Sequence, residues 1–445
     1  MDLLKYLSGQ TKKNYLKIAF LLLLAYSCSS DSERDIVEQP VIEQIKVFSF
    51  SQQYAYVNDE IQIIGENFIN DKSKVEVYLD NISADVISIS ENNITIKIPE
   101  GTTMFPSLNI VITNANITYD NPFTKIAILD NTKNKWIKIS NNFESVYTIR
   151  NFNAIGKEEI YFALQESSGL FKGKKSFNGG AFISALTYSF YREGAFFLDQ
   201  KGGGYSLILG YLFYKSKDGE STLIHDFTQN SSWNLGFFVD DVGKNFIVAM
   251  SEGRIFKSID SGKTFEKVHE NDPTEYEFEA FFALSQDQAW LAGYTYPNAT
   301  DNYFPAKILY LKEDGNWYNE SIRIEIKEGN YEYIKKIHFV DTTTGYAIAR
   351  IYNSLTDEEK YVIIKSETKG DTWEIIHESN QKIEDFTFKN KDFGWFISGN
   401  NIFKTVNGGM TWELDYTNDT ECKGILYNED ILWVIANENI LKHYF

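Results

Sequence analysis

The stretch Ser258-Ile-Asp-Ser-Gly-Lys-Thr-Phe265 returns twice further along the chain. The later copies read Ser366-Glu-Thr-Lys-Gly-Asp-Thr-Trp373 and Thr405-Val-Asn-Gly-Gly-Met-Thr-Trp412. Internal repeats are the sequence sign of an architecture built from similar units that stack on one another. These octapeptides therefore tell more about the fold than any other stretch, and they tell little about chemistry.

Each octapeptide is expected to form a tight turn between two strands. An Asp or Asn side chain can accept a hydrogen bond from a backbone N–H two residues further on, and Gly supplies the positive φ that such a turn needs. The Thr and the aromatic residue then begin the next strand, where the ring can wedge between neighbouring sheets. The positions assigned to this role are Ser258, Asp260, Gly262, Thr264, Phe265, Ser366, Gly370, Thr372, Trp373, Asn407, Gly409, Thr411 and Trp412.

The octapeptides resemble the Asp-box (BNR) repeat of sialidase-like β-propellers, and this resemblance implies a propeller fold. Asp314-Gly-Asn-Trp317 and Ser176-Phe-Asn-Gly-Gly180 look like degenerate copies. An architectural turn is the favoured interpretation, and a loop that binds a ligand or calcium is the alternative. A phosphate-binding P-loop is excluded at the first copy, because Lys257 stands where that motif needs a Gly.

A second pattern runs in phase with the octapeptides and sets the number of units. An aromatic residue leads an apolar run in each unit, and a further apolar pair follows it. The leading aromatic residues are Tyr161, Tyr205, Phe246, Trp290, Tyr346, Trp395 and Trp433. Four short strands in about 40–50 residues make one propeller blade. The seventh unit shows three strands up to Phe445, so residues 135–139, with Trp136, are expected to supply its fourth strand and close the ring.

Residues 333–414 also resemble the propeller repeats of photosystem II assembly factors (Ycf48-type). The resemblance rests on Phe339-Val-Asp-Thr-Thr-Thr-Gly-Tyr346, on Asp392-Phe-Gly-Trp-Phe396 and on Phe403-Lys-Thr405 before the last octapeptide. It implies a fold and not a role in photosynthesis. Residues 133–445 are therefore predicted to form a seven-bladed β-propeller that is closed by its own N-terminal strand.

Residues 41–128 form a separate module with a different pattern. Segments such as 75–79 and 108–112 alternate between apolar and polar residues, which is typical of half-buried strands in a sandwich. The Gly65-Glu-Asn-Phe68 turn and the Pro99-Glu-Gly101 stop closely resemble IPT/TIG domains, which are immunoglobulin-like. The predicted fold class is thus all-β, with an immunoglobulin-like sandwich followed by the propeller.

Residues 1–27 are expected to be a lipoprotein signal peptide. Lys12, Lys13 and Lys17 stand shortly before the apolar run 18–24, which is too short to span a bilayer as a stable helix. Ala25-Tyr-Ser-Cys28 resembles a bacterial lipobox, and this resemblance implies that Cys28 is lipidated. The alternative is a buried or disulfide-forming Cys28, for which Cys422 is the single available partner.

Residues 28–40 are expected to be a flexible tether. The acidic, Ser-rich run Ser29-Ser-Asp-Ser-Glu33 resembles the export signal of surface lipoproteins in Bacteroidetes, and an ordinary polar tether is the alternative. The resemblance implies a protein that is exported and held in the outer membrane by acyl chains, at the cell surface. Its partners would then be the membrane, through this anchor, and a glycan or a surface protein.

The composition narrows the classes of partner. A formal net charge of −19 argues against nucleic acid, whose binding rests on phosphate neutralisation by Lys and Arg. Aromatic residues make up 16% of the chain. Most of them are expected in the cores of the blades, and a surplus would offer flat apolar platforms for sugar rings.

No catalytic set and no metal site is visible in the sequence. A sialidase needs an arginine cluster, and no such cluster stands at the start of the propeller region. The histidines lack the spacing of metal ligands, and His338 is either structural or close to a central channel. The sequence contains no G-x-S-x-G nucleophile motif. No cofactor is expected, and an enzyme is less favoured than a binding protein.

Three functions remain open at this point. The first is a membrane-anchored, non-enzymatic binding protein, for glycans in a nutrient-uptake system. The second is a protein-binding assembly or adhesion scaffold, and the third is a propeller-fold glycosidase or polysaccharide lyase. Exposed Trp and Tyr side chains in a strip would favour glycans, a broad apolar patch would favour a protein partner, and a carboxylate pair about 5–10 Å apart would favour the enzyme.

Overall fold

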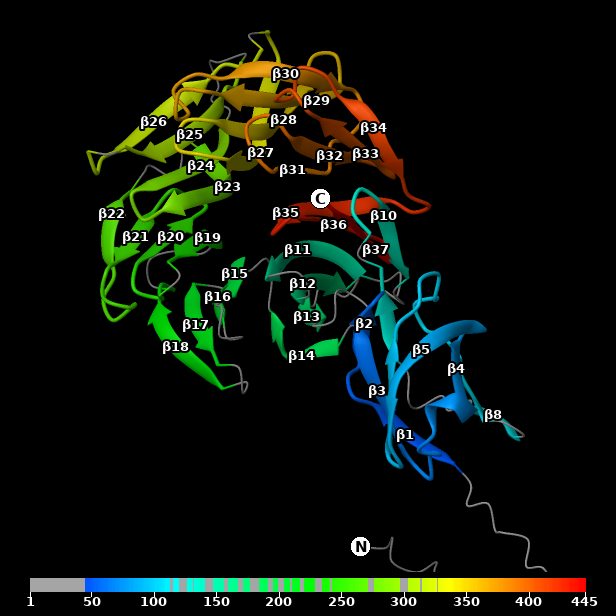
Figure 1. Ribbon diagram of the computed structural model, residues 1–445. Helices are drawn as coiled ribbons and strands as arrows, with labels where there is room; N and C mark the ends of the chain where they lie inside the picture. The colour runs from blue at the N-terminus through cyan, green and yellow to red at the C-terminus, as the bar shows by residue number, and fades with distance from the viewer. Residues whose placement is uncertain are drawn as a thin grey trace, which may run out of the picture. The chain divides into compact units, whose positions relative to one another are not determined.

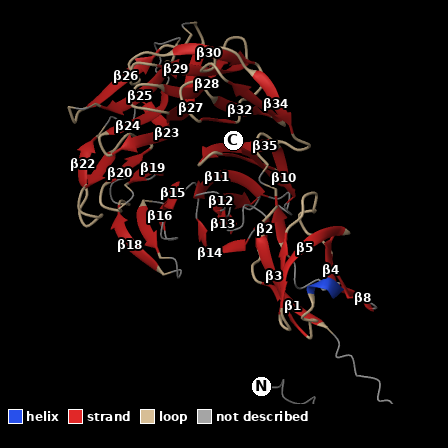
Figure 2. Ribbon diagram, in the orientation of Figure 1, coloured by secondary structure: helices blue, strands red, loops and turns tan. Residues whose placement is uncertain are grey.

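The computed structural model describes residues 45–112, 115–119, 126–130, 132–140, 147–155, 159–166, 171–176, 184–190, 195–198, 204–208, 210–216, 220–228, 234–240, 242–270, 276–296, 303–312, 314–325 and 327–445. The expected signal peptide, the tether and Cys28 lie outside these residues, as do residues 177–180 of one degenerate octapeptide. The regular secondary structure of the described residues is β-strand, apart from the short 3-10 helix η1 at Lys72–Lys74 (Figure 2). No helix in these ranges is long and apolar enough to cross a membrane.

The first strands form the module expected at residues 41–128. Seven of them join one sheet in the order β1-β3-β6-β5-β4-β7-β8, and β2 pairs in parallel with β9. The alternating apolar residues point into one core, in which Ile63, Val77 and Ile94 are fully buried. The bounds are β1 Lys46–Phe50, β2 Tyr54–Tyr56, β3 Glu60–Glu66, β4 Val75–Leu79, β5 Ile82–Ile89, β6 Asn93–Lys97, β7 Leu108–Ile112, β8 Ala115–Tyr119 and β9 Ala127–Leu129.

The turn after β3 works differently from the one expected around Gly65. Asn67 has the positive φ, 64°, whereas Gly65 lies within the strand. A Cβ atom on residue 65 would stand 2.1 Å from the backbone oxygen of Lys46 in the neighbouring strand β1. Gly65 is therefore needed for the close approach of two strands, and Asn67 makes the turn because Asn tolerates the left-handed region.

The remaining described strands form seven antiparallel four-stranded sheets (Figure 1). Six of these sheets take consecutive strands: β11–β14, β15–β18, β19–β22, β23–β26, β27–β30 and β31–β34. The seventh has the order β10-β37-β36-β35. The bounds are β10 Trp136–Ser140, β11 Tyr147–Ile155, β12 Glu159–Glu166, β13 Phe171–Ser176, β14 Ser184–Phe190, β15 Ala195–Leu198, β16 Gly204–Ile208, β17 Tyr211–Lys215, β18 Ser221–Asp226, β19 Asn234–Val239, β20 Phe246–Met250, β21 Ile255–Ser258, β22 Glu266–His269, β23 Tyr276–Ser285, β24 Gln288–Thr295, β25 Ala306–Leu311, β26 Trp317–Ile322, β27 Asn330–Phe339, β28 Gly345–Asn353, β29 Glu358–Ser366, β30 Glu374–Ser379, β31 Asp385–Phe388, β32 Gly394–Ser398, β33 Asn401–Thr405, β34 Glu413–Thr417, β35 Cys422–Asn428, β36 Ile431–Ala436 and β37 Asn439–Tyr444.

The first strands of successive sheets lie next to one another on the inner side of the arrangement (Figure 1). Contacts join β11 to β15, β15 to β19, β19 to β23 and β23 to β27, and further contacts join β31 to β35 and β35 to β11. Between β27 and β31, Lys336 forms an ion pair with Asp385. The chain is therefore all-β and propeller-like beyond residue 136.

The sheet that contains both β10 and β37 joins segments that are far apart in the sequence. Trp136 lies opposite His443, and Ser140 lies opposite Asn439. The Trp136 side chain is half-buried and packs at the edge of the core formed by residues of β32, β36 and β37: its ring stacks on Tyr416 at 5.1 Å between ring centroids and meets His443 edge-on at 5.2 Å. The fully buried aromatic residue of this sheet is Trp433 in β36.

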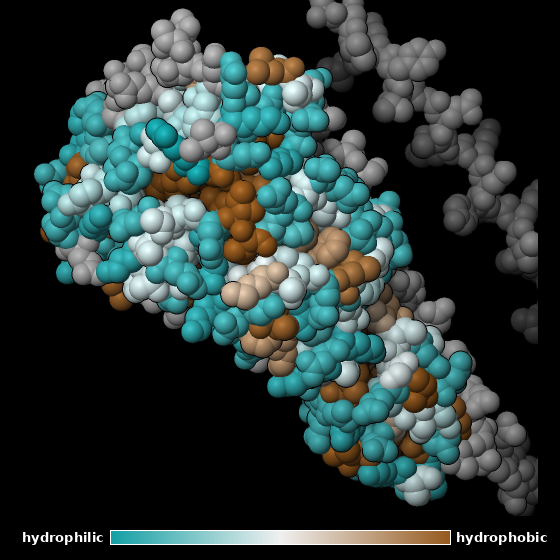
Figure 3. All heavy atoms as spheres, turned by 90° about the horizontal axis from the view of Figure 1, so that it is seen from above, coloured by the Kyte–Doolittle hydropathy of each residue, from teal (hydrophilic) through white to brown (hydrophobic). Residues whose placement is uncertain are grey.

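The surface seen from above is mostly hydrophilic, and hydrophobic residues gather in groups between the hydrophilic ones (Figure 3). This distribution is ordinary, because a large part of any protein surface is apolar. Surface hydropathy alone therefore does not single out a binding site.

Candidate functional site

The octapeptides form turns whose polar groups bond to one another. In the first copy, the backbone N–H of Gly262 donates to Ser258 Oγ at 3.0 Å. The backbone N–H of Thr264 donates to Asp260 Oδ1 at 3.0 Å, and the Thr264 hydroxyl donates to Asp260 Oδ2 at 2.7 Å. The Asp side chain thus accepts from the residue four positions on, and not two as expected, because Ser261 and Gly262 both have positive φ and lengthen the turn.

The other two copies keep the same geometry with different side chains. The N–H groups of Gly370 and Gly409 donate to the hydroxyls of Ser366 at 3.0 Å and Thr405 at 2.9 Å. Asn407 accepts from the N–H of Thr411 at 3.0 Å, and in the second copy Thr368 Oγ1 accepts from the N–H of Thr372 at 2.9 Å. Gly370 and Gly409 have φ values of 102° and 91°, so the turn needs Gly for its backbone.

The aromatic residue that ends each octapeptide contacts the preceding sheet. The Phe265 ring lies 5.0 Å from the ring of Phe227, and the Trp412 ring lies 6.1 Å from the ring of His377. Trp373 packs against Phe339 at 6.0 Å and belongs to the core shared with β24 and β25. The turns therefore have a structural role. Among the described residues, no group of three or more His, Cys, Asp or Glu side chains is arranged to hold a metal ion.

A set of tyrosines gathers at the other end of sheets β23–β26 and β27–β30. Strand β29 runs between the two ends of its sheet. It begins at Glu358, near the tyrosines, and ends at Ser366, the first residue of the second octapeptide. Its neighbour β28 places Tyr352 opposite Glu359, near the start of β29. The tyrosine patch, as we call it, consists of five half-buried residues: Tyr294, Tyr296, Tyr331, Tyr333 and Tyr352.

The rings of the tyrosine patch form a continuous series across two sheets. Centroids of Tyr296 and Tyr294 are 5.6 Å apart, and those of Tyr294 and Tyr333 are 4.8 Å apart. The series continues from Tyr333 to Tyr331 at 6.5 Å and from Tyr331 to Tyr352 at 6.2 Å. These distances are those of favourable aromatic pairs. Because the side chains of residues two apart in a strand share a side, Tyr331 and Tyr333 both reach this surface.

Carboxylates hold the hydroxyl ends of these tyrosines. Glu277 Oε2 accepts from the hydroxyls of Tyr294 at 2.9 Å and Tyr296 at 2.5 Å. The hydroxyl of Tyr352 donates to Asp357 at 3.1 Å. The hydrogen bond to Glu277, together with burial, raises the pKa of Tyr296 to about 12, so the phenol is protonated at neutral pH.

A single arginine lies among the rings of the tyrosine patch. Its guanidinium carbon is 5.7 Å from the ring centroids of both Tyr333 and Tyr352. Arg350 donates to Glu359 through Nε at 2.8 Å and through Nη2 at 3.3 Å. The bond from Arg350, with a further one from the Tyr361 hydroxyl, lowers the pKa of Glu359. The rings, the guanidinium and the carboxylates are thus fixed by contacts within the protein before any ligand arrives.

A pocket of about 340 Å³ adjoins the patch at Glu359. Asn330 and Asn353, both nearly fully buried, lie in its wall, and Asn353 Nδ2 donates to Asn330 Oδ1 at 2.7 Å. Lys360 in the same wall pairs with Glu325 at 2.6 Å and with Glu378 at 3.2 Å. Asn330, Asn353 and Lys360 point to the opposite face of the sheet from Tyr331, Tyr333 and Tyr352, so the pocket meets the tyrosine patch only at Glu359.

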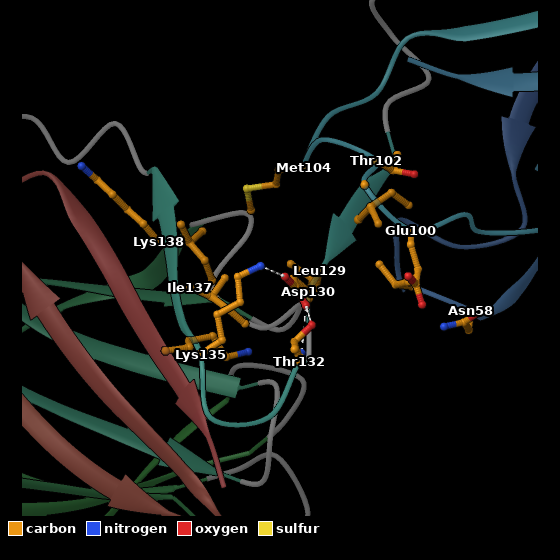
Figure 4. A pocket seen from close by; sticks show the side chains of 15 residues that line it. Asn58, Glu100, Thr102, Met104, Leu129, Asp130, Thr132, Lys135, Ile137 and Lys138 are labelled. Carbon is orange, nitrogen blue, oxygen red and sulfur yellow. Dashed lines mark hydrogen bonds and ion pairs between the residues drawn. The ribbon is translucent and has the colours of Figure 1, made fainter. Parts of the chain in front are cut away.

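A larger pocket, of about 630 Å³, lies where residues 128–139 join the two modules (Figure 4). Among the labelled residues, Asp130 contacts two others through its carboxylate: Lys135 Nζ lies 3.0 Å from it, and the N–H of Thr132 donates to it at 2.9 Å. Both bonds link residues of one short connecting segment. They brace the connection, and no ring is offered to a ligand there.

The remaining candidates from the sequence take structural places. His338 lies on the inner strand β27, with Phe282 at 4.8 Å and Phe386 at 6.3 Å between ring centroids. Burial lowers the pKa of His338 to about 3, so the imidazole is neutral at physiological pH. Cys422 is a buried free thiol in β35. Asp314 of a degenerate octapeptide accepts from the Tyr318 hydroxyl at 2.6 Å and keeps the turn without the full motif.

The tyrosine patch was missed by the sequence analysis, although a signal for it exists. The tripeptides Tyr294-Thr-Tyr296 and Tyr331-Glu-Tyr333 each place two tyrosines on one side of a strand. Neither tripeptide repeats in the other units, so a search for repeats passes over both. Their adjacency becomes visible once β24 and β27 are known to be neighbours.

Comparison with known proteins supports both modules at the level of the fold. Residues 44–125 match the model of the IPT/TIG domain. A structure of YCF48 bound to D1 peptide has a TM-score of 0.50 at 12% identity, covering 71% of this chain and 98% of its own. The β-propeller domain of Myceliophteria thermophila Cps50 (Swd1) has a TM-score of 0.43 at 10% identity, covering 70% and 100%.

An auxiliary nutrient binding protein from Bacteroides thetaiotaomicron has a TM-score of 0.35 at 11% identity, covering 90% of this chain and 98% of its own. At these identities the likenesses concern the fold alone. A comparison with curated proteins found no match.

Proposed function

We propose that this chain is an exported, membrane-anchored binding protein that takes a glycan at its tyrosine patch. The observation that carries the proposal is the series of five tyrosine rings across β24, β27 and β28, held by Glu277, Asp357 and Arg350. An aromatic face is a flat apolar platform, and the hydroxyls and carboxylates around it offer hydrogen bonds to a polyol. Such sites bind well when they are fixed in advance, because little side-chain entropy is lost.

The architecture around the patch is part of the same proposal. The seven four-stranded sheets are the blades of one β-propeller, and β10 closes the ring through its pairing with β37. Residues 41–128 serve as a spacer, and Cys28 carries the acyl anchor after removal of residues 1–27. The support for the anchor is the lipobox-like Ala25–Cys28 after an apolar run, followed by a polar tether.

Affinity electrophoresis in gels that contain soluble polysaccharides tests the glycan site. Tyr296→Ala and Tyr352→Ala should each weaken retardation of the protein by about tenfold in affinity, which corresponds to roughly 1.4 kcal/mol. Tyr318→Ala is the matched control, since Tyr318 is also half-buried and bonded to a carboxylate but lies at the octapeptide end. Equal effects of all three substitutions, or no retardation by any polysaccharide, would contradict the proposal.

The anchor has its own test. Cys28→Ser should move the protein from the membrane fraction to the soluble fraction, because the acyl chains are lost while both modules remain. A wild-type protein that takes up no labelled fatty-acid analogue in cells would overturn the lipoprotein part and leave the glycan site standing.

A protein partner is the second candidate function, and one observation favours it. Three apolar side chains are exposed in the loops of sheet β31–β34: Phe393 by 40%, Val406 by 50% and Met410 by 77%. The N–H of Gly408 donates to the backbone oxygen of Asp392, so the two loops that carry them are adjacent. Loss of a cross-linked partner on Met410→Glu, together with no retardation of the wild-type protein by any polysaccharide, would support this function instead.

A further inference from the structure

We infer that the tyrosine patch selects uncharged polysaccharide chains and excludes polyanionic ones. The inference rests on the proposed glycan site and adds the chemical class of its ligand. It follows from how the charged groups around the rings are paired.

The cations next to the rings are each bound to a carboxylate of the protein. Arg350 is held by Glu359 in a two-bond arrangement, which is the geometry with which a guanidinium would otherwise grip a ligand carboxylate or sulfate. Lys335 lies 5.3 Å from the centre of the Tyr333 ring and forms an ion pair with Glu279. An anionic ligand would have to displace these intramolecular pairs before it gained a cation.

The pocket on the opposite face of this sheet also offers no excess of positive charge. Lys360 is engaged by Glu325 and Glu378. Lys327 is exposed at the rim, but it shares the pocket with the carboxylates Glu325, Glu358 and Glu359. The pocket therefore has no excess of positive charge to offer a uronate or a sulfate.

Two carboxylates of the patch stand without a cation. In the part of the chain that the structure describes, neither Glu277 nor Asp357 takes part in an ion pair, and both accept from tyrosine hydroxyls instead. Like charges opposed across an interface suppress wrong partners strongly, and the net charge of −19 adds a repulsive field at longer range. A neutral sugar ring meets no such repulsion, and its hydroxyls can donate to carboxylates.

Retardation in gels that contain single polysaccharides tests the inference. The neutral probes are galactomannan, xyloglucan and laminarin, and the anionic probes are polygalacturonate and alginate. Wild-type protein should be retarded by at least one neutral probe and by neither anionic probe at low salt. The matched variant is Glu277→Gln with Asp357→Asn, which keeps side-chain size and removes two negative charges.

Because Glu277 and Asp357 also hold the tyrosine hydroxyls, the double variant should bind the neutral probe more weakly than the wild type, and it should gain measurable retardation by an anionic probe at low salt. The gain should disappear at high salt, because surface charge effects are screened. In the same gels, Tyr296→Ala should weaken retardation by the neutral probe and leave retardation by the anionic probes unchanged.

The outcomes separate the inference from the proposed function. Wild-type protein that binds polygalacturonate or alginate more tightly than every neutral probe, with loss on Tyr296→Ala, would overturn the charge rule and keep the glycan site. Protein that binds no probe in either set would overturn both. If anionic probes retard the double variant no more than the wild type, Glu277 and Asp357 do not exclude polyanions. That result would also overturn the inference.

Discussion

The two ends of sheet β27–β30 use polar side chains in different ways. At the octapeptide end, hydroxyls and amides bond to backbone groups within four residues, and the turn is complete in itself. At the tyrosine end, side chains bond across strands and across sheets, as Tyr294 and Tyr333 show. Polar side chains thus complete a closed turn at one end and support a surface of half-buried rings at the other.

This difference explains why the sequence pattern predicted the octapeptide end of the sheet and not the tyrosine end. A turn made by local hydrogen bonds must keep the same types of group in every copy, such as a hydroxyl at the first position and Gly at the fifth, so the pattern repeats. A surface made from neighbouring blades occurs once and leaves no repeat. In this fold, repeated residues mark structure, and unrepeated aromatic residues at strand ends mark the place to look for function.

The largest effect is expected at the octapeptide end, from Gly409→Val. The residue has a φ of 91°, which costs a β-branched side chain about 1–3 kcal/mol. Its Cβ would also lie 2.3 Å from Ile376 Cδ1, which adds an overpacking cost of about 1–3 kcal/mol. Urea unfolding should show the sum of both.

Gly315→Val is the matched control for this substitution. Gly315 has a φ of 81°, and no atom lies within 4 Å of the place that a Cβ would take, so the variant carries the backbone cost alone. Equal losses in the two variants would show that the octapeptide turn is not packed against Ile376 as described.

A smaller effect is expected from Trp136→Ala, which probes the closing strand. A fully buried aromatic residue would cost about 3–5 kcal/mol. Trp136 is half-buried against Tyr416 and His443, so we expect about 2 kcal/mol, measured by thermal and urea unfolding. No change in stability would mean that Trp136 is dispensable for the sheet that joins β10 to β37, whereas Trp433→Ala should in any case reach the full cost of a buried aromatic.

A pH-dependent effect is expected from Asp260→Asn. Bonds from the N–H and hydroxyl of Thr264, with one from Ser258, lower the pKa of Asp260 to about 2. The folded-state pKa lies below the ordinary value near 3.9, so the contribution to stability is complete above about pH 4 and is lost as the pH falls towards 2. Wild-type protein should therefore lose more stability than Asp260→Asn over this window.

The third octapeptide provides the reciprocal experiment, since Asn407 already has an amide at the equivalent position. Asn407→Asp should introduce the same acid sensitivity there. If both variants follow the wild-type pH profile, the carboxylate of the turn is not the group that titrates.

The smallest effect on stability is expected at the tyrosine end, from Tyr352→Phe. The change removes one exposed hydrogen bond to Asp357, and such surface substitutions stay within about 0.5 kcal/mol. Thermal unfolding measures it. A loss of 2 kcal/mol or more would show that the tyrosine end is part of the structural framework, and the contrast between the two ends would disappear.

Much of the fold was open to prediction, because its signals are local. The alternation in β4 and β7, the leading aromatic residues and the octapeptides each depend on neighbours within a few residues. The turn was attributed to Gly65, but Asn67 makes it. Gly65 is required for another reason, the close approach of the Lys46 backbone oxygen, and Lys46 lies nineteen positions away in the sequence. The burial of Trp136 was overestimated for a related reason, since strand pattern does not show how far a neighbouring sheet extends.

The candidate site could not be predicted, because it depends on contacts between units. Tyr294 and Tyr333 belong to different sheets, and their rings meet because β24 and β27 lie side by side. The pairing of Arg350 with Glu359, which decides the charge that a ligand meets, arises from the register of β28 and β29. Strand register is set by packing and turn geometry, so no single residue in the sequence indicates it.

The pairing of β10 with β37 has a consequence for the order in which the molecule can be completed. During synthesis Trp136 emerges long before its partner His443. Until then the edges of both strands lack their hydrogen-bonding neighbour, and such edges favour aggregation. A truncation that removes β37 therefore exposes an edge of β10 as well, although β10 lies far from β37 in the sequence.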